Sequence, residues 1–156
     1  MVNKSSPTVN RRLLHKREVK CFGYERYDGD FDIEGHLTDV KTYGVDGFDR
    51  GSMKPGEPVH DMWLRLTVDV NLKIKGSKAE IVWSPYNICK VVEPNFNQLV
   101  GEVIGPGFTK RVRRRLGGTH GCTHLVELLG PIATTAFQTI YPKKSKPSGE
   151  VDKERK

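Results

Sequence analysis

The sequence contains few cysteines and no long hydrophobic run, and each shortage excludes a class of protein. Its apolar segments are shorter than the roughly 20 residues that a membrane-spanning helix needs, so we expect no membrane partner. Its three cysteines are odd in number and widely spaced, which argues against a disulfide framework and for free thiols or metal ligands. The first residues lack the apolar core of a secretory signal. These absences together predict a cytoplasmic protein.

The remaining composition indicates one globular domain with charged ends. A chain of 156 residues can bury one self-supporting core. The formal net charge is +7, and much of the excess lies near the two ends of the chain. We therefore predict a flexible basic tail over residues 1–10, a single domain over 11–141 and a flexible charged tail over 142–156.

Segments typical of strands come first along the chain. Residues 17–27 and 31–41 flank an Asp-Gly-Asp turn and predict a β-hairpin. Residues 62–70 alternate between apolar and polar side chains, and together with 79–84 they predict a second hairpin. Between the hairpins, the glycine- and proline-rich residues 44–58 predict a long loop. Two successive hairpins favour an antiparallel sheet.

Helical patterns follow the strands. We expect helices over residues 95–104, 108–116 and 122–141. Because Pro131 lacks an amide hydrogen, it predicts a kink near Gly130 or two abutting helices. The order of strands and then helices predicts an α+β fold, in which the C-terminal helices pack on one face of the sheet.

Cys122 lies at the expected start of the last helix, between His120 and His124. Exposed amides and the helix dipole favour an anion there, so we expect a lowered pKa for this thiol. A thiolate is both a nucleophile and a soft metal ligand. The alternative is a buried cysteine that packs the helix, with two histidines on a turn.

Two further groups lie elsewhere in the sequence. His60 and Asp61 stand where the long loop enters a strand, and Cys89 follows the next strand. The hairpin between them returns His60 and Cys89 to the same edge of the sheet, and the turn before the last helix can reach that edge too. Zinc and iron sites draw three or four ligands from cysteine, histidine and carboxylate.

Four segments within residues 56–140, GEPVHDMWLRLTVD, IVWSPYNIC, LVGEVI and GCTHLVELLGPIATTAF, follow one another in an order that resembles the iron–sulfur cluster scaffold proteins of the NifU/IscU type. His60 stands where that family has its first cysteine, and Asp61 stands for the aspartate that follows. Cys89 and Cys122 match the second and third cysteines, while a glycine precedes Cys122 where the family has histidine. The resemblance implies a NifU/IscU-like fold and a protein that holds or passes a metal centre.

A second resemblance covers nearly the whole sequence. The segments RRLLHKR, ERYDGDFDIEGHLTDVK, GEPVHDM and GCTHL, between Arg11 and Gln138, are similar to those of a bacterial family of unassigned function. This resemblance implies no biochemical role.

With the scaffold resemblance added, the sequence predicts a metal-binding protein that holds zinc or an iron–sulfur cluster. The partners would be the metal ion and a protein that donates or receives it. The expected ligands are His60, Cys89 and Cys122, with Asp61, His124 or His120 to complete four.

Two other functions stay open, and whether the protein is an enzyme is undecided. The first is a cysteine-dependent or metal-dependent enzyme that uses Cys122, with a nearby histidine as base. The second is binding of nucleic acid or an acidic partner through the basic helix 108–116. Its segment matches no known binding module and has no interleaved aromatics, so a solvated helix face is the simpler account.

Overall fold

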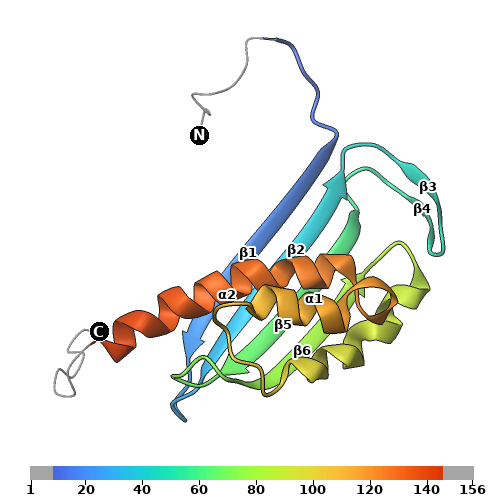
Figure 1. Cartoon of the computed structure of the whole chain (residues 1–156). Helices are drawn as coiled ribbons and strands as arrows, with labels where there is room; N and C mark the ends of the chain where they lie inside the picture. The colour runs from blue at the N-terminus through green and yellow to red at the C-terminus, as the bar shows by residue number, and fades with distance from the viewer. Residues whose placement is uncertain (1–8, 146–156) are drawn as a thin grey trace.

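The computed structural model describes residues 9–145, which form a four-stranded antiparallel sheet covered on one face by helices (Figure 1). The strand order is β1-β2-β5-β6. The bounds of these strands are His15–Glu25 for β1, Phe31–Lys41 for β2, Pro58–Val68 for β5 and Ile74–Trp83 for β6. The expected α+β fold with two hairpins and helices on one face is confirmed at this level.

The first hairpin, β1–β2, forms as its sequence predicts. The amide of Arg26 donates to the carbonyl of Asp30 at 2.8 Å, and Gly29 takes a positive φ of 91° inside the turn. Along β2 every second side chain is buried, from Phe31 to Asp39, because successive residues of a strand point to opposite faces. This alternation fixes which residues face the helices.

The segment expected to be a long loop, residues 44–58, contains a small second sheet instead. Strand β3, Val45–Phe48, pairs with β4, Gly51–Met53, and β5 already begins at Pro58. Positive φ angles at Gly47 and Gly51 shape the turn, and the Met53 side chain is buried. Strands of three or four glycine-containing residues show no alternation, so the sequence pattern could not reveal them.

The helices also depart in part from expectation. A 3₁₀ helix, η1, spans Asn87–Leu99, whereas residues 95–104 were expected to be helical. Shortly after its end, Gly101 takes a φ of 93°. Val103 then forms an isolated antiparallel β-bridge with Lys73, just before β6. Helix α1, Phe108–Leu116, has the expected bounds.

The last helix, α2, spans Thr123–Lys144 as a single element, and the prediction of two abutting helices is wrong. Pro131 is exposed, so its missing amide hydrogen interrupts the hydrogen-bond ladder on the solvent side without dividing the helix. A short 3₁₀ turn, η2, Gly118–His120, joins α1 to α2. Helix α2 passes the predicted domain end at residue 141 by three residues. The predicted tails otherwise lie largely outside the described residues.

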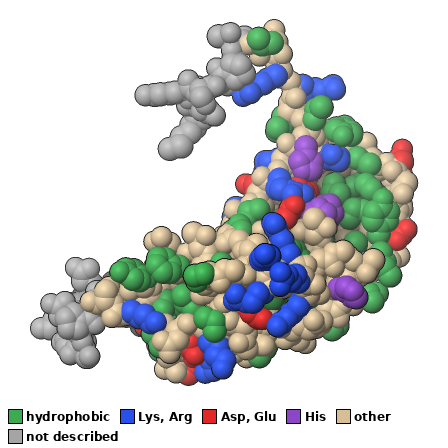
Figure 2. Space-filling view, in the orientation of Figure 1, with side chains coloured by type: hydrophobic (Ala, Val, Ile, Leu, Met, Phe, Trp, Pro, Cys, Tyr) green, Lys and Arg blue, Asp and Glu red, His purple; other side chains and the backbone are tan. Residues whose placement is uncertain are grey.

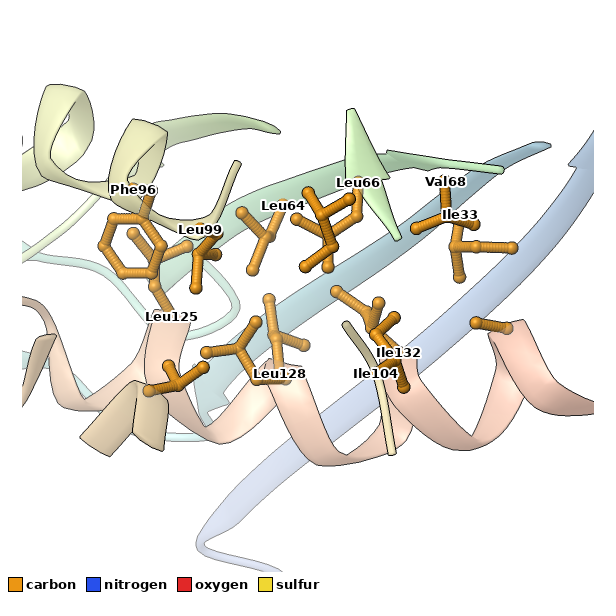
Figure 3. Packing of buried hydrophobic residues seen from close by; sticks show 14 of the residues in the cluster. Ile33, Leu64, Leu66, Val68, Phe96, Leu99, Ile104, Leu125, Leu128 and Ile132 are labelled. Carbon is orange, nitrogen blue, oxygen red and sulfur yellow. The ribbon is translucent and has the colours of Figure 1, made fainter. Parts of the chain in front are cut away.

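The core lies between α2 and the sheet. Figure 3 shows Leu125, Leu128 and Ile132 of α2 pointing toward side chains of β2 and β5. The helix comes close to the sheet because Gly23 and Gly35 have no side chains where Thr139 and Ile132 press against the strands. Within residues 9–145, no helix is long and apolar enough to cross a membrane.

Candidate metal centre

One row of side chains runs across three neighbouring strands near the end of the sheet. Arg17 of β1 lies directly opposite Asp39 of β2, and Asp39 lies directly opposite His60 of β5. All three point to the face that the helices cover, because they share the alternation of the buried residues Leu37 and Met62. The sheet register therefore places a carboxylate between a guanidinium and an imidazole.

Asp39 is the one charged side chain that is buried within residues 9–145, with 1% of its surface exposed. Its Oδ1 accepts from Arg17 Nε at 2.7 Å and from His15 Nε2 at 2.8 Å. Its Oδ2 accepts from Arg17 Nη2 at 2.8 Å and from His60 Nδ1 at 2.9 Å. Burial by itself would raise the pKa of Asp39, but the hydrogen bonds from Arg17 and His15 outweigh it and hold the pKa well below its usual value. The carboxylate is therefore ionised.

His60 is a neutral imidazole with a defined tautomer. Burial, and repulsion from a charge on His124, lower the pKa of His60 to about 4, even though Asp39 opposes the shift. Because the ionised Asp39 can only accept, the proton of the neutral ring lies on Nδ1. The Nε2 atom of His60 then carries a free lone pair.

The first turn of α2 brings a second imidazole to this row. The ring centroids of His60 and His124 lie 3.8 Å apart, with the ring planes tilted by 32°. Burial and the charge of Arg17 lower the pKa of His124, so this ring is neutral too. One turn further, Glu127 accepts from Arg17 Nη1 at 2.9 Å and ties α2 to β1. Figure 2 shows histidine, basic and acidic side chains gathered on this part of the surface.

Cys122 occupies the N-cap position of α2 and is 8% exposed. Its Sγ lies 3.8 Å from Sδ of Met62 and 3.9 Å from Nδ1 of His124. The expected lowering of its pKa at the helix start is wrong. Burial raises the pKa of this thiol and outweighs the backbone hydrogen bonds at Leu125 and His124. The free protein therefore carries a thiol rather than a thiolate at neutral pH.

The structure brings some of the predicted ligands together and separates others. Cys89 is partly buried in η1 and lines a pocket with Cys122 and His124. Asp61 points to the opposite face of the sheet from His60, as its neighbouring position in a strand requires, and accepts from His36 Nε2 at 2.7 Å. His120 is exposed in η2 and is not part of the cluster.

The tightest cluster of possible ligands contains a residue that the sequence analysis missed. One ligand atom each from Asp39, His60 and His124 lies within 4.8 Å of the other two. Asp39 could have been noticed, because it puts a carboxylate on the inward face of a strand whose other inward side chains are apolar or glycine. Its partners His15 and Arg17 follow only from the strand register, which the sequence does not state.

The pocket beside the cluster has a volume of about 360 Å³ and lies between η1 and the start of α2. His124 belongs both to the cluster and to the pocket wall, and Cys122, whose Sγ lies 3.9 Å from Nδ1 of His124, lines the pocket beside it. The cluster therefore adjoins a concave surface, where a small molecule could meet it.

Comparison with known proteins identifies a family without a stated role. Residues 15–138 match the family described as "Protein of unknown function (DUF2889)", and the chain belongs to this family. This confirms the second resemblance drawn from the sequence. No curated protein and no solved structure matches the chain, so nothing supports the resemblance to NifU/IscU scaffold proteins.

Proposed function

We propose that the protein binds one transition-metal ion of the zinc and iron class through His60, His124 and Cys122, with Asp39 holding His60 in place. The observation that carries the proposal is the hydrogen bond from His60 Nδ1 to the buried carboxylate of Asp39. It turns the unprotonated Nε2 of His60 into a metal ligand whose ring is fixed by a carboxylate, an arrangement common among metal-binding histidines.

The protonation states suit metal binding. A histidine must be neutral to coordinate a metal, and the pKa values of both rings are lowered from the ordinary histidine value. Two neutral imidazoles in contact also avoid the repulsion that two imidazolium rings would experience. Metal binding at neutral pH then displaces no proton from either ring.

Asp39 is assigned to positioning rather than to the metal itself. Four donors already occupy its two oxygens, and two of them come from the permanently charged Arg17. Direct coordination would bring a divalent cation against this guanidinium. The carboxylate acts on the metal through His60 instead.

Cys122 is the third ligand because its Sγ lies 3.9 Å from Nδ1 of His124. Two ligands of one tetrahedral zinc ion are separated by a similar distance, about 3.6 Å, when the bonds are about 2.3 Å to sulfur and 2.1 Å to nitrogen. Binding removes the thiol proton, since the metal takes up the thiolate. His124 must turn about its side-chain bonds, because the lone pairs of two rings that face each other with a tilt of 32° do not meet at one point.

Three protein ligands leave one position of a tetrahedral ion open, which is the arrangement of zinc sites that act on a bound molecule. The raised pKa of Cys122 disfavours a free cysteine nucleophile, so a metal-dependent activity fits these residues better than a cysteine-dependent one.

A second candidate is a protein that carries an iron–sulfur cluster, the role implied by the resemblance to NifU/IscU proteins. It is favoured by Cys89 and Cys122 lining one pocket together with His124, which offers a second thiolate ligand. Iron-loaded protein prepared without oxygen separates the candidates. A cluster gives strong visible absorption that Cys89→Ala removes. A single iron ion does not use Cys89, so Cys89→Ala should bind it as the wild-type protein does.

Isothermal titration of the metal-free protein with Zn²⁺ tests the main proposal. We expect one ion per chain, with affinity reduced by at least about tenfold in His60→Ala and His124→Ala, and by about 10–100-fold in Asp39→Asn. His36→Ala is the matched control, since His36 also donates to an aspartate, Asp61, but lies on the other face of the sheet. Equal affinity in all four variants would show that zinc binds elsewhere and would overturn the proposal.

A further inference from the structure

We infer that the pocket between η1 and the start of α2 binds a small, uncharged, mainly apolar molecule that lies against the metal position. The contact with the metal rests on the proposed function. The pocket itself is a feature of the metal-free protein and can be tested without any metal.

The chemistry of the pocket wall selects the class of ligand. Apolar side chains, two thiols and two threonines form most of it, and no lysine, arginine, aspartate or glutamate of the described residues lines it. A charged ligand would lose its hydration there without gaining an ion pair. The apolar side chains are those of Ile88 and Val92, and the thiols are those of Cys89 and Cys122.

Three other hollows of the described surface lack this combination. One is lined by Arg50 and Glu57, and another by four charged residues that include Glu34 and Arg65. The groove between α1 and α2 beside Phe137 is apolar but contains no titratable or metal-ligating side chain. The pocket beside the cluster joins an apolar wall to possible ligands of a metal.

The volume of the pocket sets the size of the ligand. About 360 Å³ is available, whereas an apolar cavity of about 150 Å³ accommodates benzene in an engineered protein. A molecule with one substituted ring or two fused rings therefore fits. His124 and Cys122 belong both to the wall and to the proposed ligand set, so such a molecule would face the open coordination position.

Protection of thiols from alkylation tests the inference directly. Cys89 lines the pocket, whereas Cys21 lies on β1 and is absent from the pocket wall, so it serves as an internal control. Metal-free protein is treated with iodoacetamide, with and without indole, a neutral two-ring probe, and the labelled cysteines are quantified by mass spectrometry. At ten times its Kd, indole should slow labelling of Cys89 by about tenfold and leave Cys21 unchanged.

Two variants and a charged probe sharpen the test. Val92→Trp should fill the pocket and abolish the protection by indole, whereas Val91→Trp, at a neighbouring residue that is 67% exposed, should preserve it. Indole-3-sulfonate should protect far less than indole, since its charge finds no partner.

The outcomes separate this inference from the proposed function. Protection of Cys89 by indole in a protein that binds no zinc would support the pocket and reject the metal site. Zinc binding without any protection, or equal protection of Cys89 and Cys21, would reject the pocket. Equal protection in Val92→Trp and wild type would place the indole site elsewhere and would also reject it.

Discussion

At the scale of single residues, Asp39 organises the site. It is a buried carboxylate with four donors, two of them from Arg17. Asp61, one position from His60, has one histidine partner and a partly exposed side chain. The two aspartates therefore provide a matched pair, in which the same chemical group has different surroundings.

We expect Asp39→Asn to lower the free energy of unfolding by about 2 kcal/mol, because charge-assisted hydrogen bonds are lost and the charge of Arg17 keeps only Glu127 as its anionic partner. Asp61→Asn should cost less than about 1 kcal/mol, because Asp61 has one side-chain partner and is itself partly exposed. Urea denaturation of both variants measures the difference. Equal losses would mean that the row of residues around Asp39 adds nothing to stability.

The pKa of His60 predicts how stability depends on pH. It is about 4 in the folded protein and 6.5 for an unperturbed histidine, so the unfolded chain binds a proton that the folded chain refuses. This titration leaves stability unchanged above about pH 6.5, lowers it by roughly 3 kcal/mol as the pH falls from 6.5 to 4, and has no further effect below that. Asp39 adds a further loss below about pH 4, since its folded pKa is lowered.

Urea denaturation of the metal-free protein between pH 4 and 7 measures this slope, and His60→Gln should flatten it. An NMR titration of the imidazole resonances gives the pKa directly. His124→Ala should raise the pKa of His60 toward its ordinary value, because it removes both burial and a repelling charge. A pKa near 6.5 for His60 in the wild-type protein would contradict the neutral-imidazole account.

At the scale of elements, the packing of α2 on β1 and β2 positions His124 over the sheet. A methyl group added at Gly23 would lie 2.9 Å from Cβ of Thr139, closer than such atoms approach in proteins. A methyl group at Gly130, inside α2, would contact nothing within 4 Å. These two glycines therefore predict opposite effects of the same substitution.

Gly23→Ala should lower the free energy of unfolding by about 1–3 kcal/mol, because the helix or Thr139 must shift. Gly130→Ala should raise it by about 0.5–1 kcal/mol, since alanine favours a helix interior. Thermal denaturation of the two variants checks the signs. A neutral Gly23→Ala would show that α2 does not depend on close approach to β1.

The sequence predicts secondary-structure elements better than it predicts the contacts between them. The hairpin β1–β2 follows from alternation of apolar and polar residues, and helix α1 follows from apolar residues four positions apart, Phe108, Val112 and Leu116. Both patterns are local. The strands β3 and β4 are too short to show a period, and η1 is a 3₁₀ helix with a proline inside.

The residues of the candidate site could be predicted only in part, because local patterns do not show which elements come together. His60, His124 and Cys122 stand out as chemically reactive types near element ends. Asp39 and Arg17 become functional candidates only through a register that pairs residues 21 to 22 positions apart in sequence. Register depends on how whole strands bury their faces, and a single sequence states it only indirectly.

At the scale of the whole molecule, the site joins the sheet to the helical layer. His60 belongs to β5, and Asp39 belongs to β2. His124 and Cys122 stand at the start of α2, more than 60 residues later in the chain. Glu127 adds an ion pair to Arg17 of β1 across the same junction. Because its ligands come from both layers, a metal bound there would require the sheet and α2 to be packed together.

The measurement that tests the central claim most directly is X-ray absorption at the zinc edge of the zinc-loaded protein. The account predicts two imidazole nitrogens at about 2.0–2.1 Å and one sulfur at about 2.3 Å, with the sulfur lost in Cys122→Ser. An imidazole contribution should also disappear in His60→Ala and persist in His36→Ala. A zinc ion surrounded only by oxygen, or one whose spectrum is unchanged in Cys122→Ser and His60→Ala, would contradict the account.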